Sequence, residues 1–570
     1  MSWAIRKKFR ELLNREDGYE KKSWGSALTI CLAYPNRYRT GMGNLGFQTV
    51  YKLLNRQSAV ICERVFLPDP GDEASFSPGP LPLFSLESQR PLRDFDIVAF
   101  SLSFENDYPH ILKILSLGGI PLLAGERTAG DALIIAGGIC VTMNPEPLAD
   151  FFDLFLIGEA EALLPDFLAA LRHHREKGDK KDELLLGLQR DVPGAYIPRL
   201  YEVTYHNDGL IAAMTPVVPF LPRKIGKKWA ADIQDLATES VIMAPDAEFG
   251  AMYLMEISRG CSRGCRFCAA GYLCRPVRFR RREYLQGAIA RGLAKGKKIG
   301  LIGTAVSDHP QLIEICRDIL SAGGQIGAAS LRLDMLSPDL VALLKQGGIK
   351  TPALAPEAGS QRLRDLIRKG ISEADITEAA MKLLQGGFEQ LRLYFLVGLP
   401  TETAADIEAV IELIWRLARI TTTTAGPVEK RFQRLTVSIN QFIPKAGTPF
   451  QWHPLEDIQT IRKKIQSIAG AFRGRGNIRI AAEPAKSNYL QALFARGDRR
   501  VGRFLLALHN LEGNWMRARK EAALDPDFFV YRLRGATEIL PWDFIATGVP
   551  KTLLRKEFEA AQPMAANKIY

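Results

Sequence analysis

Three cysteines stand close together near the middle of the chain, in the segment Cys261-Ser-Arg-Gly-Cys265-Arg-Phe-Cys268. Thiolates at such a spacing bind zinc or an iron–sulfur cluster. Structural zinc and an electron-carrying cluster both use four protein ligands, and Cys274 is the nearest candidate for a fourth. Three cysteines alone would leave one iron of a [4Fe-4S] cluster open. We therefore predict that Cys261, Cys265 and Cys268 are metal ligands, with a four-ligand zinc site as the alternative.

The distribution of the cysteines bears on the compartment. Of the eight cysteines, four fall between residues 261 and 274 and the others are scattered, which is not the pattern of a disulfide framework. No apolar stretch reaches the roughly 18 residues needed to cross a bilayer, and the basic N-terminus lacks the apolar core of a signal peptide. We expect a cytoplasmic protein without a membrane span. The net charge of +12 is a modest excess for this length, so nucleic acid is only a weakly supported partner.

The elements that must position these cysteines form an α/β pattern. From residue 251, six apolar runs alternate with helical stretches, many of which end in glycine, and this predicts a partial (β/α)6 barrel. The runs are "MYLMEIS", "KIGLIG", "QIGAASLR", "TPALAP", "LRLYFLVG" and "LTVSINQF". Ligands of parallel β/α folds sit at the carboxyl ends of strands. The three cysteines directly follow the first run, which is where an active site is expected.

The first part of the chain shows a second alternation. Five apolar runs between residues 26 and 170 predict an open, largely parallel, Rossmann-like sheet. A G-x-G-x-x-G occurs from Gly41 to Gly46, but it does not directly follow a strand, which favours a tight turn in a loop over a nucleotide site. The predicted domains are a helical extension (1–25), an α/β domain (26–172), a connector (173–250), a barrel (251–450) and a mainly helical C-terminal region (451–570).

The cysteine motif supports a specific resemblance. Cys-x3-Cys-x2-Cys with Phe267 before the last cysteine, after the first strand of a β/α barrel, resembles the signature of the radical SAM superfamily. The resemblance implies a [4Fe-4S] cluster whose open iron chelates the amino and carboxylate groups of S-adenosylmethionine. One electron then cleaves the sulfonium, giving methionine and a 5′-deoxyadenosyl radical that abstracts hydrogen. It also implies an electron donor such as flavodoxin or ferredoxin.

Later segments resemble the parts of that family that surround the cofactor. "IGLIGTAVSD" resembles the second strand, near the methionine amino group; "SLRLD" resembles the third, near the ribose or carboxylate; "APEAGSQRLR" and "YFLVGLPTET" resemble the fourth and fifth. Taken singly, Arg332 and Glu357 could be an ordinary ion pair, and Gly398 could simply end a strand. The cofactor-binding residues that the resemblance implies are Phe267, Gly303, Thr304, Ser307, Ser330, Arg332, Glu357, Val397, Gly398, Leu399 and Pro400.

The flanking regions extend the resemblance to nearly the whole chain. The N-terminal region resembles the cobalamin-binding-like domain that precedes many radical SAM barrels, in "CLAYPNRYRTGMGNLG", "DIVAFSLSF" and "IIAGGICVTMNPEPLADFFDLFLIGEAEAL". The Asp-x-His-x-x-Gly that supplies a lower cobalt ligand is missing, so the fold is expected and cobalamin is a further candidate cofactor. The tail resembles that of an uncharacterised radical SAM family with the same three-part layout.

Three functions follow from these observations. The leading one is a radical SAM enzyme that abstracts hydrogen from an unknown substrate, with cobalamin-assisted methyl transfer as a variant; no catalytic acid or base is assigned. A methylthiotransferase-like enzyme acting on RNA or protein is the first alternative, with Cys31, Cys62 and Cys140 holding a second cluster. The other alternative is a non-catalytic zinc or iron–sulfur protein that binds nucleic acid through its positive charge.

Overall fold

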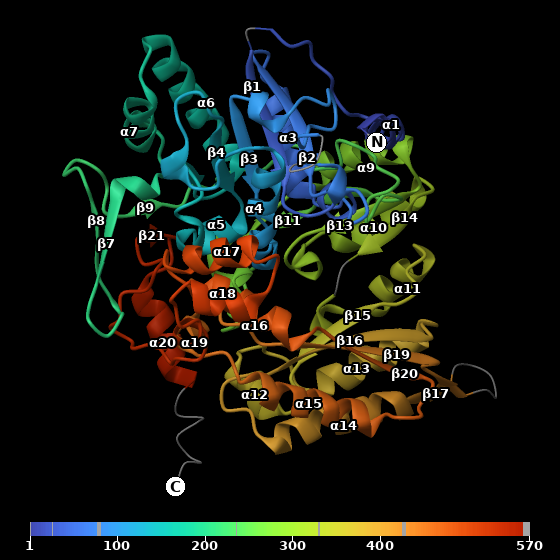
Figure 1. Cartoon of the computed structure of the whole chain (residues 1–570). Coiled ribbons are helices and arrows are strands. Elements are labelled where there is room, and N and C mark those ends of the chain that lie inside the picture. Colours follow the sequence, from blue (N-terminus) through green and yellow to red (C-terminus); the bar gives the residue numbers. More distant parts are fainter. Residues whose placement is uncertain are drawn as a thin grey trace. The chain divides into compact units, whose positions relative to one another are not determined.

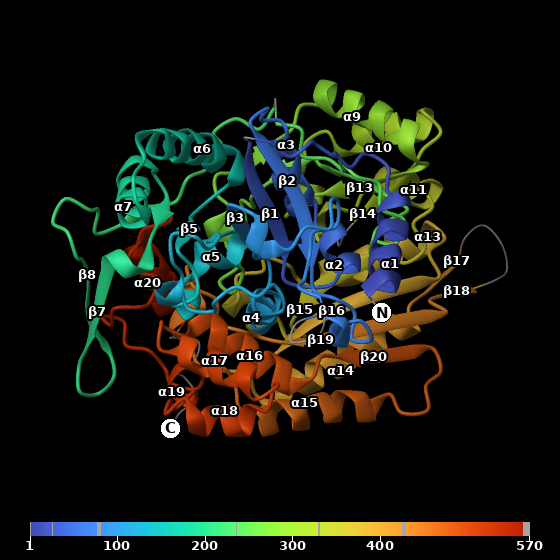
Figure 2. The same cartoon turned by 45° about the horizontal axis from the view of Figure 1, so that its top comes forward.

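A computed structural model of the chain describes residues 2–25, 27–76, 81–234, 236–328, 331–423 and 429–561. The described residues fall into two compact units (Figures 1 and 2). The first consists of 2–251, 493–529 and 535–548, and the second of 252–492, 530–534 and 549–561. The predicted extension and connector therefore belong to the first unit.

The C-terminal region predicted at 451–570 does not form a third unit, because its segments complete the other two. In the first unit, the buried Asn144 side chain donates hydrogen bonds to the carbonyls of Ala495 and Gly497. In the second unit, the Leu455 N–H donates to the carbonyl of Val530 over 2.9 Å. Contacts between residues this far apart along the chain leave no local pattern in the sequence.

A six-stranded sheet forms the centre of the first unit, in the order β2-β1-β3-β4-β5-β6. The first five strands run parallel and β6 runs antiparallel to β5. This confirms the predicted Rossmann-like sheet, and the order of the first five strands is the flavodoxin-like one. The strands are β1 (Leu28–Tyr34), β2 (Val60–Phe66), β3 (Ile97–Ser101), β4 (Leu133–Gly137), β5 (Leu154–Leu156) and β6 (Ala195–Tyr196).

Helices connect these strands and cover the sheet. The segment from Gly41 to Gly46 breaks one helix from the next, and the Asn44 side chain caps the second helix by accepting from the Phe47 N–H. It is therefore not a phosphate-binding turn between a strand and a helix. The remaining elements of this unit include α1 (Ser2–Asn14), α2 (Tyr38–Met42), α3 (Leu45–Asn55), α4 (Tyr108–Leu117), α5 (Ile139–Met143), α6 (Ala160–Lys177), α7 (Lys181–Asp191), α17 (Val501–Asn510), α18 (Trp515–Glu521) and the hairpin β7 (Tyr201–Tyr205) and β8 (Ile211–Pro216).

The second unit contains all six predicted barrel strands and one more. Two parallel sheets, β10-β13-β14 and β15-β16-β19-β20, are joined by a parallel bridge between Leu331 and Leu354. The additional strand β20 lies beyond the predicted end of the barrel at residue 450. The strands are β10 (Tyr253–Glu256), β13 (Lys298–Ile302), β14 (Gln325–Ala328), β15 (Ala353–Glu357), β16 (Gln390–Val397), β19 (Arg434–Gln441) and β20 (Ile478–Ala482).

Three of the helices between these strands begin at serine side-chain caps. Ser337, Ser360 and Ser372 each accept a hydrogen bond from a backbone N–H in the first turn of the helix that follows. Such caps fix where each connection ends and the helix starts. The helices are α9 (Arg282–Lys295), α10 (Leu312–Ser321), α11 (Pro338–Gln346), α12 (Gln361–Leu366), α13 (Glu373–Gln385), α14 (Ala404–Arg419), α15 (Ile458–Ala471) and α20 (Lys551–Ala561). None of the helices in the described ranges combines the length and apolarity that crossing a membrane requires.

Candidate active site

The three cysteines lie on one loop between the short strand β11 (Ser258–Arg259) and the short helix α8 (Ala270–Leu273). The loop turns at Gly260, whose φ is 86°. A Cβ at this position would stand 2.2 Å from the Cys274 carbonyl oxygen, so both the backbone angle and the close approach require glycine. The loop therefore closes on itself at the carboxyl end of the first barrel strand, as the sequence predicts.

Arginines inside the motif hold the loop against the rest of the barrel. Arg266 donates to the Leu366 carbonyl over 2.7 Å and pairs with Glu557 at 3.1 Å. Arg263 forms a two-bonded ion pair with Asp308, with both distances 3.1 Å. The residues between the cysteines thus tie the loop to α12, to α20 and to the turn after β13.

The central cysteine is the most buried of the three. Burial raises the pKa of the Cys265 thiol to about 11, although the nearby charges of Lys369 and Arg332 pull it down. Burial also raises the pKa of Cys268, against the backbone N–H groups of Ala270 and Gly271, which hydrogen-bond to its sulfur. Burial therefore favours the protonated form of these two thiols, and iron must displace their protons on binding.

Glu357 lies beside these thiols in an unusual backbone conformation. Its φ is +67°, and the register between β15 and β16 shifts between Leu354 and Glu357. Such irregularities re-aim side chains next to active sites. The Glu357 carboxylate forms an ion pair with Lys369 at 3.0 Å, and the two side chains are only 15% and 11% exposed. Lys369 was not singled out from the sequence, although its charge reaches Cys265.

The short strand β11, which follows the first barrel strand, carries a buried hydroxyl without a hydrogen-bond partner in the described structure. Ser258 is 1% exposed, and its Oγ has no hydrogen-bond partner among the described residues. A Cβ on Gly303 would stand 2.5 Å from this oxygen, so the backbone at 303 packs against the hydroxyl and leaves room only for glycine. Thr304, the next residue, is exposed. The sequence pointed to Gly303 and Thr304 but not to Ser258, which reads there as an ordinary strand-end residue.

Ser307 and Arg332 are brought together as the sequence suggested. The Arg332 N–H donates to Ser307 Oγ over 2.9 Å. The Arg332 guanidinium forms a two-bonded pair with Asp334, at 2.9 and 3.0 Å. Arg332 and Glu357 are therefore not paired with each other, because each has its own partner. Ser330 lies outside the described residues.

The fifth-strand segment keeps most of its backbone bonds within the protein. The Gly398 N–H donates to the Glu402 carboxylate over 2.8 Å, and the Val397 and Leu399 carbonyls accept from the N–H groups of Phe442 and Glu402. This segment ends at Pro400. It can therefore contact adenine mainly through its surface and less through backbone hydrogen bonds. Phe267 packs against the same apolar cluster as Leu399, so the cysteine loop and this segment meet.

The donor set distinguishes a cluster from a single metal ion. In the parts of the chain that are described, no three His, Cys, Asp or Glu side chains are placed to hold one ion, which argues against a preformed zinc site that includes Cys274. Cluster thiolates each bind a different iron and stand farther apart. Cys261, Cys265 and Cys268 lie within electrostatic reach of one another, amid Lys369 and nearby arginines. These residues fit an anionic [4Fe-4S] cluster.

The three other cysteines considered as cluster ligands do not come together. Cys31 and Cys62 are 0% and 1% exposed on adjacent strands. Ile30 is the register partner of Cys62, so Cys31 points to the opposite face of the sheet. Burial raises the pKa of both thiols. Cys140 is equally buried. The geometry therefore argues against a second cluster at these positions.

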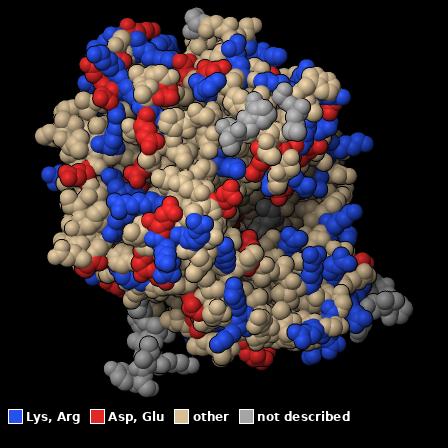
Figure 3. All heavy atoms as spheres, viewed as in Figure 1, with Lys and Arg blue, Asp and Glu red and all other residues tan. Residues whose placement is uncertain are grey.

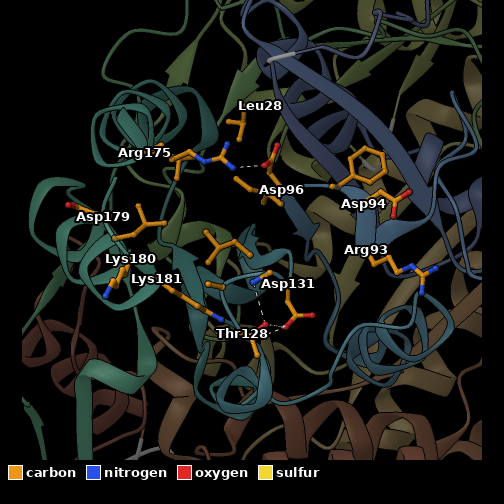
Figure 4. A pocket seen from close by; sticks show the side chains of 17 residues that line it. Leu28, Arg93, Asp94, Asp96, Thr128, Asp131, Arg175, Asp179, Lys180 and Lys181 are labelled. Atoms are coloured by element: carbon orange, nitrogen blue, oxygen red, sulfur yellow. Dashed lines mark hydrogen bonds and ion pairs between the residues drawn. The ribbon is translucent and has the colours of Figure 1, made fainter. Parts of the chain in front are cut away.

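A pocket of about 390 Å³ opens at the end of the first unit's sheet where the strands begin (Figure 4). It lies beside Leu28, Ile97 and Leu133, near the amino ends of their strands, whereas ligands of parallel sheets bind at the carboxyl ends. Several of its cations are already neutralised: Arg175 pairs with Asp96, and Lys181 pairs with a carboxylate at 3.2 Å. We assign no ligand to this pocket.

Comparison with known proteins adds two family matches and one long relative. The family described as "Radical SAM proteins, N-terminal" matches residues 46–198, and "Radical SAM superfamily" matches residues 255–414. The chain is 31% identical over 483 residues to the uncharacterised protein MJ0966 of Methanocaldococcus jannaschii, covering 84% of this chain and 90% of the relative.

Solved structures give weaker likenesses. The radical S-adenosylmethionine methyltransferase TsrM from Kitasatospora setae, with cobalamin and a [4Fe-4S] cluster bound, is 12% identical with a TM-score of 0.47, covering 87% of this chain and 98% of its own. The cobalamin-dependent S-adenosylmethionine radical enzyme OxsB, with aqua-cobalamin bound, is 15% identical with a TM-score of 0.45, covering 70% of this chain and 54% of its own. Family membership rests on the sequence matches.

Proposed function

Because this chain belongs to the radical SAM superfamily, and is therefore an enzyme that uses a [4Fe-4S] cluster and S-adenosylmethionine, we propose that it abstracts hydrogen from a substrate bound in its barrel. The observation that carries the proposal is the loop with Cys261, Cys265 and Cys268 at the carboxyl end of β10, next to the buried Glu357 and Lys369. Charged groups buried beside reactive thiols are typical of functional sites.

Different residues around the loop would bind the cluster and S-adenosylmethionine. The three cysteines would hold three irons, and the bound pair of cofactors supplies reductive cleavage of S-adenosylmethionine to methionine and a 5′-deoxyadenosyl radical. Lys369 keeps the Glu357 carboxylate in place, and Glu357 would accept hydrogen bonds from the cofactor's amino or hydroxyl groups. Ser258, packed against Gly303, would use its free hydroxyl on the methionine part.

Other residues would bind the cofactor by shape. Phe267 and the segment Val397–Pro400 offer an apolar surface of the kind on which adenine packs. Arg332 and Ser307 are held by their own hydrogen bonds at the edge of the site, where Arg332 adds positive charge near Cys265. Its charge would favour an anionic cluster and the carboxylate of S-adenosylmethionine.

The experiment is to reconstitute the protein with iron and sulfide without oxygen, reduce it with dithionite and measure 5′-deoxyadenosine. Cys265→Ala should lose both the cluster's absorption and the product. Cys274→Ala is the matched control, because it removes a thiol thirteen residues from Cys261 that we do not assign to the cluster. Product formation by Cys265→Ala would refute the ligand assignment, and loss of iron in Cys274→Ala would favour a four-cysteine site.

A second candidate function, methyl transfer assisted by cobalamin, is favoured by the strand order of the first unit. In a sheet of this order, ligands bind between the carboxyl ends of β1 and β3. Polar side chains gather there: Asn44 donates to Ser103 over 3.2 Å, and Asn36 donates to Asp107 over 2.7 Å. The test is absorption of the purified protein after loading with cobalamin and removal of the free cofactor. One equivalent per chain would favour methyl transfer, and none would leave hydrogen abstraction without cobalamin.

A further inference from the structure

Three arginines lie on neighbouring strands of the second unit and point to the same face of the sheet. Gln390 pairs with Arg434, and Arg392 pairs with Thr436, which in turn pairs with Arg479. Paired residues of parallel strands share a face, so Arg392, Arg434 and Arg479 form one group, here called the arginine row. Because strands are about 4.8 Å apart, the three Cα atoms lie within roughly 10 Å of one another.

The arginine row has no ion-pair partner among the residues that the structure describes. All three side chains are exposed, and none forms an ion pair with a carboxylate in the described ranges of the chain. Like charges on facing positions of a sheet repel one another. Figure 3 shows Lys and Arg side chains gathered in the region where Figure 1 labels β16, β19 and β20. Three unneutralised guanidinium groups at this spacing are the arrangement that an anion would stabilise.

The face that carries the arginine row is the one that leads to the cysteine loop. Helices α14 and α15 lie together on one side of the sheet (Figures 1 and 2), and the alternate residues Leu391, Leu393 and Phe395 of β16 are fully buried. Leu396 lies on the other face, that of Arg392, and packs against the same apolar cluster as Phe267 of the cysteine loop. One strand therefore connects the arginine row with the loop.

The side chains between these two points are polar. Tyr394 on β16 and Thr436, Ser438 and Asn440 on β19 share this face and are partly exposed. The interior of a closed β/α barrel is instead filled with bulky apolar residues. A partly exposed polar wall is suited to a hydrophilic ligand lying along the strand, from the arginine row toward the cysteine loop.

We propose that the arginine row binds a phosphate or diphosphate group of the substrate. A guanidinium offers up to five N–H donors, and a single bidentate arginine is enough for one carboxylate. Three arginines match a group with several oxygens and more than one negative charge, which is the chemistry of phosphates. The inference rests on the proposed function, since it names the substrate class of that same barrel.

The geometry also sets the length of the substrate. Arg392 and Val397 are five residues apart on one strand, which corresponds to roughly 16 Å. Arginine side chains reach back over part of that distance. The carbon that loses hydrogen should therefore lie on the order of 10 to 16 Å from the phosphate, which requires an elongated substrate and excludes a small phosphorylated sugar.

The test is calorimetric titration of the anaerobically reconstituted full chain with inorganic pyrophosphate and, separately, with a short single-stranded oligoribonucleotide. The variants are Arg392→Gln, Arg434→Gln and Arg479→Gln; since the side chains are exposed, the fold should tolerate the change. Arg462→Gln on α15 is the matched control, because it removes the same charge from an exposed helix position.

We expect each variant in the arginine row to weaken pyrophosphate binding roughly tenfold, with the control unchanged and with affinity falling as salt is added. If the oligoribonucleotide loses affinity in the same variants and pyrophosphate binds weakly, the phosphate belongs to a nucleic acid. The reverse result identifies an elongated phosphorylated molecule that is not a nucleic acid. Affinity that the variants do not change, or binding of citrate in preference to both probes, would overturn the proposal. No S-adenosylmethionine is present, so this result is independent of the 5′-deoxyadenosine assay.

Discussion

Replacing Ser258 by alanine should raise the stability of the empty protein and lower its affinity for S-adenosylmethionine. The hydroxyl is 1% exposed and has no partner in the described structure, so it is removed from water without compensation. A buried polar group without a partner is unusual in a folded chain, and binding of the cofactor would explain it. The two effects of Ser258→Ala therefore have opposite signs, which a residue with a purely structural role would not give.

The structure gives the size of both effects. A buried hydroxyl without a partner costs about 1 to 3 kcal/mol, which the alanine variant no longer pays. Removing the oxygen also loses some packing contacts, which offsets part of this benefit. The free energy of unfolding should therefore rise by about 1 kcal/mol. A hydrogen bond to the cofactor contributes about 0.5 to 1.5 kcal/mol, so its loss should weaken binding roughly threefold to tenfold. Ser85→Ala is the matched control. That serine is also fully buried, but its Oγ donates to Glu63 over 2.5 Å, so the same substitution there should destabilise.

Two assays measure these changes: the thermal midpoint of the cluster-free chain, and equilibrium dialysis of S-adenosylmethionine against the reconstituted protein. Ser258→Ala should raise the midpoint and the dissociation constant together. If it lowers the midpoint and leaves the dissociation constant unchanged, the hydroxyl has a structural partner and the reasoning is wrong. Gly303→Ala gives a further check, because its Cβ would stand 2.5 Å from Ser258 Oγ and should weaken binding less in the Ser258→Ala background.

Three other outcomes follow from the site. Lys369→Met would leave the Glu357 carboxylate buried without its partner and should cost about 2 to 3 kcal/mol, measured by denaturant unfolding against Lys369→Arg. Gly260→Ala should prevent cluster loading, read from iron content, because its Cβ would stand 2.2 Å from the Cys274 carbonyl oxygen; normal loading would contradict the loop geometry. Burial lowers the pKa of His309, so its contribution to stability is present above the ordinary pKa of 6.5 and is lost as the pH falls below it. The thermal midpoint should therefore drop between pH 7 and pH 5, less so in His309→Gln, and equal drops would remove His309 as the cause.

The sequence predicted the strands well because each strand is a short apolar run that can be recognised from its own residues. Apolar runs bounded by glycine placed all six barrel strands and the cysteine loop after the first of them. The loop's neighbours were harder to find. Lys369 follows Glu357 by twelve residues and reaches it only because α12 turns the chain back, which no spacing rule expresses. Ser258 is recognisable as a candidate binding residue only in the structure, where its buried hydroxyl has no hydrogen-bond partner among the described residues.

The division of the tail could not be predicted for a related reason. Segments after residue 492 belong alternately to the two units, and the bonds that join them to the first unit link residues some 350 positions apart. Periodicity indicates that a segment is helical and which face is apolar, but not which distant surface that face will cover. The arginine row likewise becomes visible only once the strand register is known, since its members come from three separate stretches.

The late return of the tail to the first unit has a consequence for synthesis on the ribosome. Glu146 is 1% exposed, and its partner Arg499 is 353 residues further along the chain. At typical elongation rates those residues take on the order of 20 to 70 s to make, and for that time the carboxylate has no guanidinium to meet it. The nascent first unit stays incomplete until Arg499 has been made, so the growing chain is exposed to proteases and to chaperones for that time. Truncations from the C-terminus should accordingly destabilise the beginning of the chain as much as its end.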